Sequence, residues 1–415
     1  MKRIIELIKS QKQIIENFSY LGLAQLFNML APFIILPYLI SVLGIENYGK
    51  VVLVQTAAYY FIIIIRFGLN LVGARNIAEN EDNKEEKNKI FSIIFYLKSI
   101  FIILIYLSLF LFTQLFNVDK DLFIFYSFGV LIALNELLFP QWFFQGIQKL
   151  KYVTIISLVI KIIFTSLIFL IIKNENQYIY VPLIIGLGNI SGGLLSLKIV
   201  FFNEKIKLVK VNFSEMKIVI KDSIPLFLSS VIISIKDKSN VIFINLILGA
   251  SAVSIYEIGI KFMNLVLMPI DIINSSIYPK MSKEKNIKYL IKIMRFTFLL
   301  TLLIIIIAFF LITPFLNIYS PQLLEAVNII RILLIAPLIF SLSLPLSING
   351  LIIFNKNKYL LVGMILTVSF YFTLLSIFYV LGKLNNVIDF AIITVLVYLF
   401  ELAYRYIVCK RLKII

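Results

Sequence analysis

Three consecutive charged residues, Lys236, Asp237 and Lys238, lie at the middle of an apolar segment that covers residues 223–248. A segment of this length can cross a bilayer, which takes about 20 apolar residues. A charged side chain at the bilayer centre costs at least about 2.5–3.5 kcal/mol, so the three residues are expected to face protein or a water-filled cavity. Transporters bind their cargo in such cavities near the membrane midplane. The triplet therefore indicates a binding site for a polar cargo inside the membrane.

Further charges interrupt the other apolar segments, and basic residues outnumber acidic ones there. The surplus positive charge has to be hydrated or matched by an anion. Lys and Arg side chains are suited to bind the phosphates of a diphosphate. The basic residues expected to line a cationic cavity are Arg66, Lys161, Lys236, Lys238, Lys261 and Arg331. The acidic residues expected beside them, either to neutralise a cation or to carry a coupling ion, are Glu136, Asp237, Glu257 and Asp271.

Polar residues recur at helical spacing beside these charges, which predicts helix faces that line an aqueous cavity. The polar members of these faces are Gln55, Asn70, Asn240 and Asn264. Glu257 and Lys261 are four residues apart, as are Glu401 and Arg405, so each pair can form an ion pair on its own helix. For Glu257 and Lys261, pairing with each other and contact with the cargo both remain open.

Side chains of consecutive helical residues point about 100° apart, so the charged triplet cannot face the cargo as a whole. Lys236 is expected to face the cavity together with Asn240, while Asp237 restrains a neighbouring cation. Lys98 and Arg295 lie within a few turns of the cytoplasmic surface, and both are expected to extend their charged ends to it.

The elements that position these residues are expected to be membrane-spanning helices. The chain of 415 residues is 61% hydrophobic with a mean hydropathy of +1.00, whereas soluble domains are about 45–50% apolar. Apolar runs separated by charged or Asn/Gly turns predict an all-α integral membrane protein with twelve spans. The spans lie near residues 17–43, 50–73, 90–116, 122–144, 152–172, 178–200, 223–248, 252–279, 290–316, 322–349, 358–381 and 387–409.

Lys and Arg gather in every second connection between spans. The opposite side holds only Lys50, Lys120, Lys173 and Lys383. The positive-inside rule therefore places both termini in the cytoplasm. Residues 1–16 have the spacing of an amphipathic helix on the membrane surface. The connection 201–222 divides the spans into six-helix bundles at residues 17–210 and 211–415, with a faint echo between Leu43-Gly44 and Leu248-Gly249.

Several function classes are disfavoured by what the sequence lacks. The net charge of +17 follows the membrane topology, so binding of nucleic acid is not needed to explain it. The chain has no His, which excludes His-ligated metal sites, and its one cysteine, Cys409, cannot form an internal disulfide. There is no phosphate-binding loop of the ATPase type, and the short outer loops leave no room for a catalytic domain. We expect neither an enzyme nor a bound cofactor or metal.

One stretch at the inner end of the fourth span follows a pattern P-x-W-x-F-Q-G, and its defining residues are Pro140, Trp142, Phe144, Gln145 and Gly146. Further stretches lie at residues 38–49, 67–78, 237–238 and 256–282. In this order, over the whole chain, they resemble the Wzx-type O-antigen and polysaccharide flippases, which belong to the multidrug/oligosaccharidyl-lipid/polysaccharide (MOP) exporter superfamily. Trp142 itself is expected to be an aromatic anchor at the membrane interface.

The resemblance implies a MOP/MATE-like V-shaped fold with a central cationic cavity and alternating access. It implies a cargo of oligosaccharide on undecaprenyl diphosphate, an O-antigen, capsule or other surface polysaccharide repeat. The cargo would be flipped from the cytoplasmic to the periplasmic leaflet of the bacterial inner membrane. Expected partners are this lipid-linked glycan, membrane lipids, and polysaccharide polymerase or chain-length proteins. The chain is expected to act as a monomer.

Two other functions remain open at this stage. An ion-coupled multidrug exporter of the same superfamily would bind organic cations, which prefer an acidic and aromatic cavity to a basic one. A membrane polysaccharide polymerase or glycosyltransferase would need a sizeable outer loop with catalytic residues. Coupling to H+, to Na+ or to the membrane potential is also open. Without His, a coupling ion would have to use Glu136, Asp237, Glu257 or Asp271.

Overall fold

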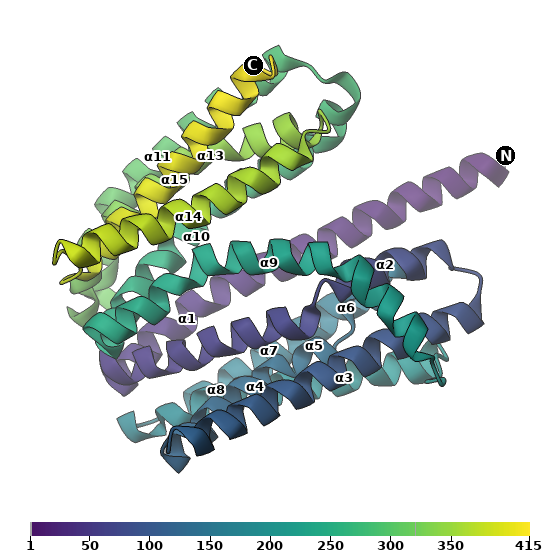
Figure 1. The fold of residues 1–415 in the computed structure, drawn as a ribbon, viewed down its shortest axis with the longest axis horizontal. Coiled ribbons are helices and arrows are strands. Elements are labelled where there is room, and N and C mark those ends of the chain that lie inside the picture. The colour runs from purple at the N-terminus through teal and green to yellow at the C-terminus, as the bar shows by residue number, and fades with distance from the viewer. Residues whose placement is uncertain (1, 320) are drawn as a thin grey trace. The chain divides into compact units, whose positions relative to one another are not determined.

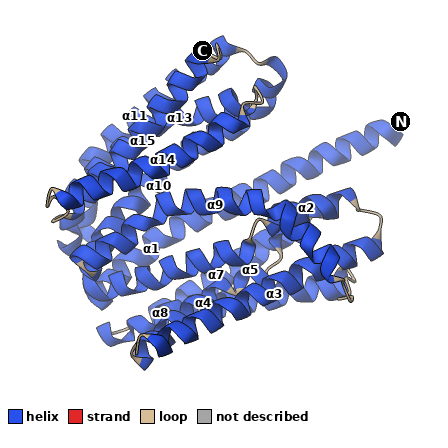
Figure 2. Cartoon of the chain, viewed as in Figure 1, coloured by secondary structure: helices blue, strands red, loops and turns tan. Residues whose placement is uncertain are grey.

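The computed structural model describes residues 2–319 and 321–415, with side chains described for residues 27, 30–317, 321 and 323–415. Throughout this part of the chain the regular elements are helices, joined by short loops (Figure 2). Eleven of the described helices are long and apolar enough to cross a membrane. The first of them, Leu30–Arg66, holds two predicted spans, because its backbone leaves the helical conformation at Gly44. The prediction of an all-α membrane protein with twelve spans is confirmed.

The chain folds into two compact units. Unit 1 consists of the residues up to Gly44 together with Leu53–Val231, and unit 2 of Ile45–Val52 together with Ile232–Ile415. The chain therefore passes from unit 1 to unit 2 between Val231 and Ile232, within the helix α9 (Phe213–Leu248). The predicted domains 17–210 and 211–415 stay a prediction. Residues 2–16 are helical and continuous with the first span, while the predicted apolar face of residues 1–16 lies outside the described side chains.

In unit 1, α8 packs against both α4 and α7, while α3 packs against α4 and α2 against α6 (Figure 1). The fourth span is divided into α4, α5 and α6, and the break between α5 and α6 lies at Pro140, which has no N–H to continue a helix. The helices of this unit, besides the first part of α9, are α1 (Lys2–Arg66), α2 (Leu69–Glu79), α3 (Lys84–Leu115), α4 (Lys120–Ala133), α5 (Asn135–Leu138), α6 (Gln141–Gly146), α7 (Leu150–Ile171), the 3₁₀ helix η1 (Glu175–Ile179), α8 (Tyr180–Lys198) and the π-helix η2 (Ile199–Asn203).

In unit 2, α15 packs against α12, α13 and α14, and α10 packs against α12 and α13. The tenth span is divided into α12, α13 and η4. The helices of this unit, besides the end of α9, are α10 (Ala250–Glu284), α11 (Ile287–Tyr319), the 3₁₀ helix η3 (Pro321–Ala326), α12 (Val327–Leu333), α13 (Ile335–Pro345), the π-helix η4 (Leu346–Ile352), α14 (Asn357–Val380) and α15 (Val387–Arg411).

Two glycines make the same turn at the start of each half. Gly44 has φ 76° and ψ 166°, and Gly249, which precedes α10, has φ 87° and ψ 177°. This backbone region is accessible essentially to glycine alone, because a Cβ atom would clash with the neighbouring backbone. The segment after Gly44 packs in unit 2, where Ser254 Oγ donates a hydrogen bond to the carbonyl of Ile45. The faint sequence echo between the halves therefore corresponds to a shared backbone turn.

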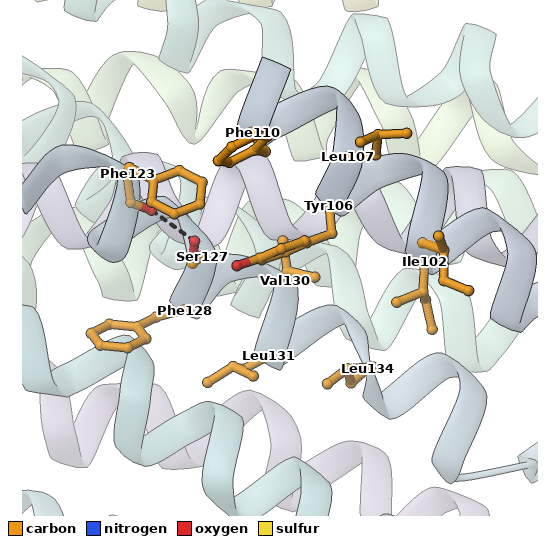
Figure 3. A pocket seen from close by; sticks show the side chains of 11 residues that line it. Ile102, Tyr106, Leu107, Phe110, Phe123, Ser127, Phe128, Val130, Leu131 and Leu134 are labelled. Atoms are coloured by element: carbon orange, nitrogen blue, oxygen red, sulfur yellow. Dashed lines mark hydrogen bonds between the residues drawn. The ribbon is translucent and has the colours of Figure 1, made fainter. Parts of the chain in front are cut away.

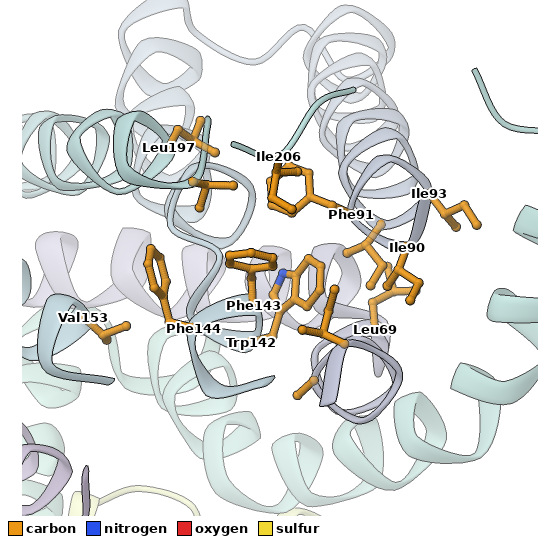
Figure 4. Packing of buried hydrophobic residues seen from close by; sticks show 14 of the residues in the cluster. Leu69, Ile90, Phe91, Ile93, Trp142, Phe143, Phe144, Val153, Leu197 and Ile206 are labelled. Atoms are coloured by element: carbon orange, nitrogen blue, oxygen red, sulfur yellow. The ribbon is translucent and has the colours of Figure 1, made fainter. Parts of the chain in front are cut away.

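The core of unit 1 contains the tryptophan of the P-x-W-x-F-Q-G stretch. Trp142 is only 3% exposed and stacks on Phe91 with ring centroids 5.8 Å apart (Figure 4). Gly73 of α2 lies directly against the indole, because a Cβ added there would be 2.6 Å from Trp142 Cε3. The expectation that Trp142 is an interfacial anchor is wrong. Its ring joins α2, α3 and α6, so the stretch forms part of the core.

The connection that follows η2 is fixed to α3 in the same unit. Ile206 is 3% exposed in the core that contains Trp142. The backbone N–H of Lys207 donates to Asn88 Oδ1 at 2.9 Å, and that of Val209 donates to Ser92 Oγ at 2.9 Å. These bonds explain why the connection belongs to unit 1.

Candidate functional site

The first candidate site is a group of four polar residues in unit 1, the Glu136 cluster, formed by Arg66, Asn70, Lys98 and Glu136. Glu136 Oε2 accepts hydrogen bonds from Arg66 Nη2 at 3.1 Å and Nε at 3.4 Å. Its Oε1 accepts from Asn70 Nδ2 at 2.6 Å and from Lys98 Nζ at 3.1 Å. One carboxylate therefore holds two cations from two other helices.

Lys98 lies in the protein interior and not at the membrane surface, where it was predicted. Its side chain is 1% exposed, and its Nζ donates to Asn70 Oδ1 at 2.7 Å as well as to Glu136. A third bond, at 2.8 Å, reaches the main-chain carbonyl of Glu136. In a continuous helix that carbonyl would accept from the N–H of residue 140, which proline lacks. The prediction that Lys98 extends to the membrane surface is wrong, because it fills a place that Pro140 leaves open.

A second cluster lies in unit 2 and consists of Lys236, Glu401 and Arg405, here called the Glu401 cluster. Lys236 Nζ is 3.3 Å from Glu401 Oε2, and Arg405 Nη2 donates to Glu401 Oε1. Arg405 Nη1 also donates to Ser343 Oγ at 2.9 Å. The predicted pair on α15 is confirmed, and Lys236 joins it from α9. Asp237 is farther from Lys236, at 3.9 Å, and its side chain is 43% exposed.

The third cluster, also in unit 2, is the Glu257 cluster of Lys238, Glu257 and Lys261. Glu257 is buried, with Lys261 Nζ 3.2 Å from its Oε1 and Lys238 Nζ 3.6 Å from its Oε2. Lys261 also interacts with the hydroxyl of Tyr48, a residue of the segment that follows Gly44. The i,i+4 pairing of Glu257 with Lys261 is thus formed, with a second lysine on the same carboxylate.

Asn240 is buried in a hydrogen-bond network of unit 2. Its Nδ2 donates to Tyr256 Oη at 2.7 Å and to Thr394 Oγ1 at 3.0 Å, and its Oδ1 accepts from Tyr371 Oη at 2.8 Å. Its side chain is 3% exposed. The structure therefore separates Asn240, which joins α9, α10, α14 and α15, from Lys236, with which it was expected to line a cavity.

A face of α10 carries polar residues that are exposed. Asn264 and Asp271 are both exposed, seven residues apart, on the face that begins with Glu257 and Lys261. No ion pair or hydrogen bond of the Asp271 carboxylate occurs among the described residues of unit 2. An exposed carboxylate in the interior of a span has to be in contact with water or with another protein segment.

The remaining predicted residues are not part of the three clusters. Arg331 of α12 lies over the Phe309 ring at 4.3 Å and donates to Thr313 Oγ1 at 3.2 Å, both on α11. Lys161 on α7 and Gln55 on α1 are partly exposed. The structure therefore brings Lys238 and Lys261 onto one carboxylate, but gives Arg331 an aromatic neighbour instead of an acidic one.

The other residues of the P-x-W-x-F-Q-G stretch serve packing. Pro140, Phe144 and Gly146 are buried. A Cβ added to Gly146 would lie 2.7 Å from Ile77 Cγ2, so the glycine permits close contact of α6 with α2. Gln145 is exposed. Of this stretch, Gln141 and Gln145 are exposed and could meet a ligand without disturbing the core.

A cavity in unit 1 has a different chemistry from the clusters. It has a volume of about 820 Å³ and lies between α3 and α4 (Figure 3). Its lining is aliphatic and aromatic, with Tyr106 and Ser127 as the hydroxyl-bearing residues, and Ser127 Oγ is bonded to the carbonyl of Phe123. The lining carries no charged side chain, so this cavity does not suit a diphosphate.

The comparisons with known proteins identify the family and the fold. A family model described as polysaccharide biosynthesis protein matches residues 14–285. The chain belongs to this family. It is 27% identical, over 64% of its length, to an Escherichia coli (strain K12) protein named a candidate O-antigen transporter. It is 26% identical, over 66% of its length, to a Shigella dysenteriae protein of the same name. The matched parts cover 64% and 69% of these relatives, so the chain spans about two thirds of their length.

Solved structures share the fold of this member of the polysaccharide biosynthesis family. The lipid II flippase MurJ in an inward closed conformation superposes with a TM-score of 0.69 at 17% identity, over 94% of this chain and 87% of MurJ. A Vibrio cholerae MATE transporter superposes with a TM-score of 0.63 at 15% identity, over 96% of both chains. The predicted MOP-type fold of two six-helix bundles is confirmed, and the chain is a multi-pass membrane protein.

Sequence reasoning missed three members of the clusters as site residues: Lys98, Glu401 and Arg405. For Glu401 and Arg405 the four-residue spacing was a usable signal, whereas their link to Lys236 spans 165 residues. For Lys98 the signal was its position on an otherwise apolar helix, together with a proline four residues after Glu136. Such contacts arise from tertiary packing and have no local pattern.

Proposed function

We propose that this protein is a flippase that translocates lipid-linked oligosaccharide units, carried on undecaprenyl diphosphate, from the cytoplasmic to the outer leaflet of the bacterial inner membrane. The observation that carries the proposal is the composition of the clusters. The Glu136, Glu257 and Glu401 clusters each hold two cations on one buried carboxylate. The Glu136 and Glu257 clusters therefore have a surplus positive charge inside membrane-spanning helices, which a diphosphate would match, whereas in the Glu401 cluster Asp237 lies 3.9 Å from Lys236 and balances that surplus.

The names of the similar proteins support the cargo class. The two relatives are named for O-antigen transport, and MurJ is named for flipping lipid II. The cytoplasmic placement of both termini is supported by the uneven distribution of Lys and Arg between alternate loops, and the direction of transport is proposed from the resemblance to O-antigen flippases. Movement of the two units by alternating access, around a central cationic cavity, is the mechanism that the proposal requires.

The proposed cargo contacts are the cations that keep an accessible charge. Arg66 is half exposed, and Lys236, Lys238 and Lys261 are each partly exposed within their clusters. Lys161 and Arg331 are proposed as additional contacts, on α7 and α12. Since no chemical step is involved, the protein acts by binding and conformational change and not as an enzyme.

Coupling to an ion is a further part of the proposal. Glu136 and Glu257 are each the shared counter-charge of two cations, so protonating either would leave both cations of its cluster without that carboxylate charge. Four acidic residues were predicted to be able to carry a coupling ion. Of these, Asp237 and Asp271 are exposed, and both lie in spans of unit 2. An ion that drives transport would therefore use these two aspartates, with H+ and Na+ as the candidates.

The test is a deletion strain in which lipid-linked glycan and surface glycan are both measured. The deletion is expected to accumulate lipid-linked glycan on the inner leaflet and to lose surface glycan. Complementation with Arg66→Gln, Lys236→Gln or Lys261→Gln should each lower surface glycan about tenfold or more, because a charge-assisted hydrogen bond contributes about 1.5–3 kcal/mol. The matched control is Lys292→Gln, an exposed lysine of α11 outside the clusters, which should behave as the unmodified protein.

The opposite outcome would be a deletion strain with normal surface glycan and increased sensitivity to cationic dyes. That result would favour a multidrug exporter, whose fold is also similar to this one. The basic clusters argue against it, since organic cations are repelled by a surplus of Lys and Arg.

A further inference from the structure

The Glu136 cluster is almost closed as a hydrogen-bond network. Each of the four lone-pair positions of the Glu136 carboxylate has a donor. Each of the three N–H bonds of the Lys98 ammonium has an acceptor, in Asn70 Oδ1, Glu136 Oε1 and the Glu136 carbonyl. Arg66 bonds Glu136 through Nε and Nη2, and its Nη1 makes no hydrogen bond among the described residues. The donors left over in the cluster belong to Arg66 and to the second N–H of the Asn70 amide, and only Arg66 carries a charge.

The two cations of the cluster differ sharply in exposure. The side chain of Lys98 is 1% exposed, whereas that of Arg66 is 49% exposed. A cargo can therefore reach Arg66 but not Lys98. If Glu136 had Arg66 as its only cation, the pair would be neutral and the outward guanidinium would attract an anion weakly. With Lys98 present, the cluster keeps a net charge of one, and the accessible part of that charge is on Arg66.

We propose that Lys98 is a positioning residue for anion binding: it neutralises Glu136 from the buried side, so that Arg66 is held in place by this carboxylate yet presents its charge to a diphosphate. This inference rests on the proposed function, because it assumes that Arg66 meets the diphosphate of the cargo. Pro140 contributes by leaving the Glu136 carbonyl free to accept the third Lys98 bond.

The Glu401 cluster repeats the arrangement in unit 2. Arg405 is buried, with its side chain 9% exposed, and it is held by Glu401 and Ser343. Lys236, on the other side of the carboxylate, is 18% exposed. A buried cation, a buried carboxylate and a more exposed cation thus occur in both units, on unrelated helices. Because the arrangement occurs in both units, a functional role explains it better than the need to neutralise one particular buried glutamate.

The competing explanation is that Lys98 only stabilises a buried carboxylate. The two explanations differ for a double variant. Lys98→Met alone leaves Glu136 paired with Arg66, so the cluster becomes neutral. Lys98→Met combined with Glu136→Gln removes one charge of each sign, so Arg66 again carries a net charge of one. If Lys98 only stabilises Glu136, the double variant should not recover anion binding. If Lys98 allows Arg66 to present its charge, the double variant should recover it.

The experiment measures binding of farnesyl diphosphate to the full-length protein in lipid nanodiscs, with farnesol as the uncharged reference probe. Thermal unfolding of each variant shows that it is folded. Lys98→Met is expected to weaken binding of farnesyl diphosphate about tenfold or more, and Arg66→Gln by a similar factor. Lys98→Met/Glu136→Gln should recover most of the loss, and Lys98→Arg should bind as the unmodified protein. Should Lys98→Met not fold, Lys98→Gln, which keeps a donor for Asn70, takes its place with the same expected loss.

Two outcomes would overturn the inference: folded Lys98→Met binding the diphosphate as tightly as the unmodified protein, or a folded double variant binding as weakly as Lys98→Met. A different binding result would show that the proposed function itself is wrong. In that case the unmodified protein would bind farnesyl diphosphate no better than farnesol, or Arg66→Gln would leave binding unchanged.

Discussion

Replacing Trp142 by alanine tests whether the P-x-W-x-F-Q-G stretch is structural or binds cargo. The indole is 3% exposed and contacts Phe91 by stacking and Phe143 edge-on. Truncation would therefore leave a cavity between α2, α3 and α6. We expect Trp142→Ala to lower the free energy of unfolding strongly and to reduce transport only through loss of folded protein.

The magnitude follows from the burial. Replacing a buried Trp or Phe by Ala costs about 3–5 kcal/mol in soluble proteins, as the sum of a transfer term and a cavity term. In a membrane protein the transfer term is smaller, because lipid is as apolar as the protein interior, whereas the lost packing contacts remain. Because the transfer term is smaller, we expect a loss at the lower end of this range, about 3 kcal/mol.

The assay is reversible unfolding by SDS in mixed micelles, with Gln145→Ala as the matched control from the same stretch. Gln145 is exposed, so its truncation should change stability by less than about 0.5 kcal/mol. A double-mutant cycle adds Gly73→Ala, whose methyl group would lie 2.6 Å from the indole. Gly73→Ala should destabilise the unmodified protein and do so much less when residue 142 is alanine.

One result would refute the reasoning. If Trp142→Ala retained the full free energy of unfolding while abolishing surface glycan, the ring would act on the cargo and not on the core. Equal effects of Gly73→Ala in both backgrounds would likewise contradict the contact between α2 and the indole.

Two further predictions concern the polar interior of unit 2, and both are measured by the same SDS unfolding. Asn240→Leu leaves buried hydroxyls without their amide partner, so a loss of about 2–3 kcal/mol is expected, and an unchanged stability would contradict the network. Glu257→Gln removes the buried carboxylate that Lys238 and Lys261 share and should cost about 3–5 kcal/mol. The matched control Asp271→Asn, at an exposed position of the same helix, should change stability by less than about 0.5 kcal/mol, and equal losses for both would contradict the assignment.

The spans were predictable from the sequence because a bilayer imposes a simple rule on every segment that crosses it. About 20 apolar residues must follow one another, and polar turns must separate them. The same kind of local rule gave the pairs of Glu257 with Lys261 and of Glu401 with Arg405, which lie one helical turn apart. The turns at Gly44 and Gly249 left only a faint echo, because one glycine is a weak signal for an unusual backbone conformation.

The positions of Lys98 and Trp142 were predicted wrongly for a common reason. Both side chains are amphipathic, and near the end of a span such side chains usually reach the interface. What moved them inside was a partner far away in the sequence: Glu136 for Lys98, at a separation of 38 residues, and Phe91 for Trp142. Periodicity describes one helix at a time, so it identifies which residues share a face but not what that face meets.

The proposed anion site contains acidic residues as well as basic ones, and the ratio of the two explains how such a site could exist in a membrane. A lysine or arginine without a counter-charge is expensive to bury, whereas a one-to-one pair is neutral and offers little to a diphosphate. Two cations on one carboxylate satisfy both conditions, since each cation has the carboxylate as a counter-charge and one unit of positive charge remains. In the Glu136 cluster that charge is on the more exposed member, Arg66, whereas in the Glu401 cluster Asp237 lies 3.9 Å from Lys236 as a second carboxylate. In the Glu257 cluster the two lysines are 24% and 18% exposed, so the charge is shared. Replacing one lysine of that cluster should therefore weaken anion binding less than replacing Arg66, a ranking that the nanodisc measurement can test directly.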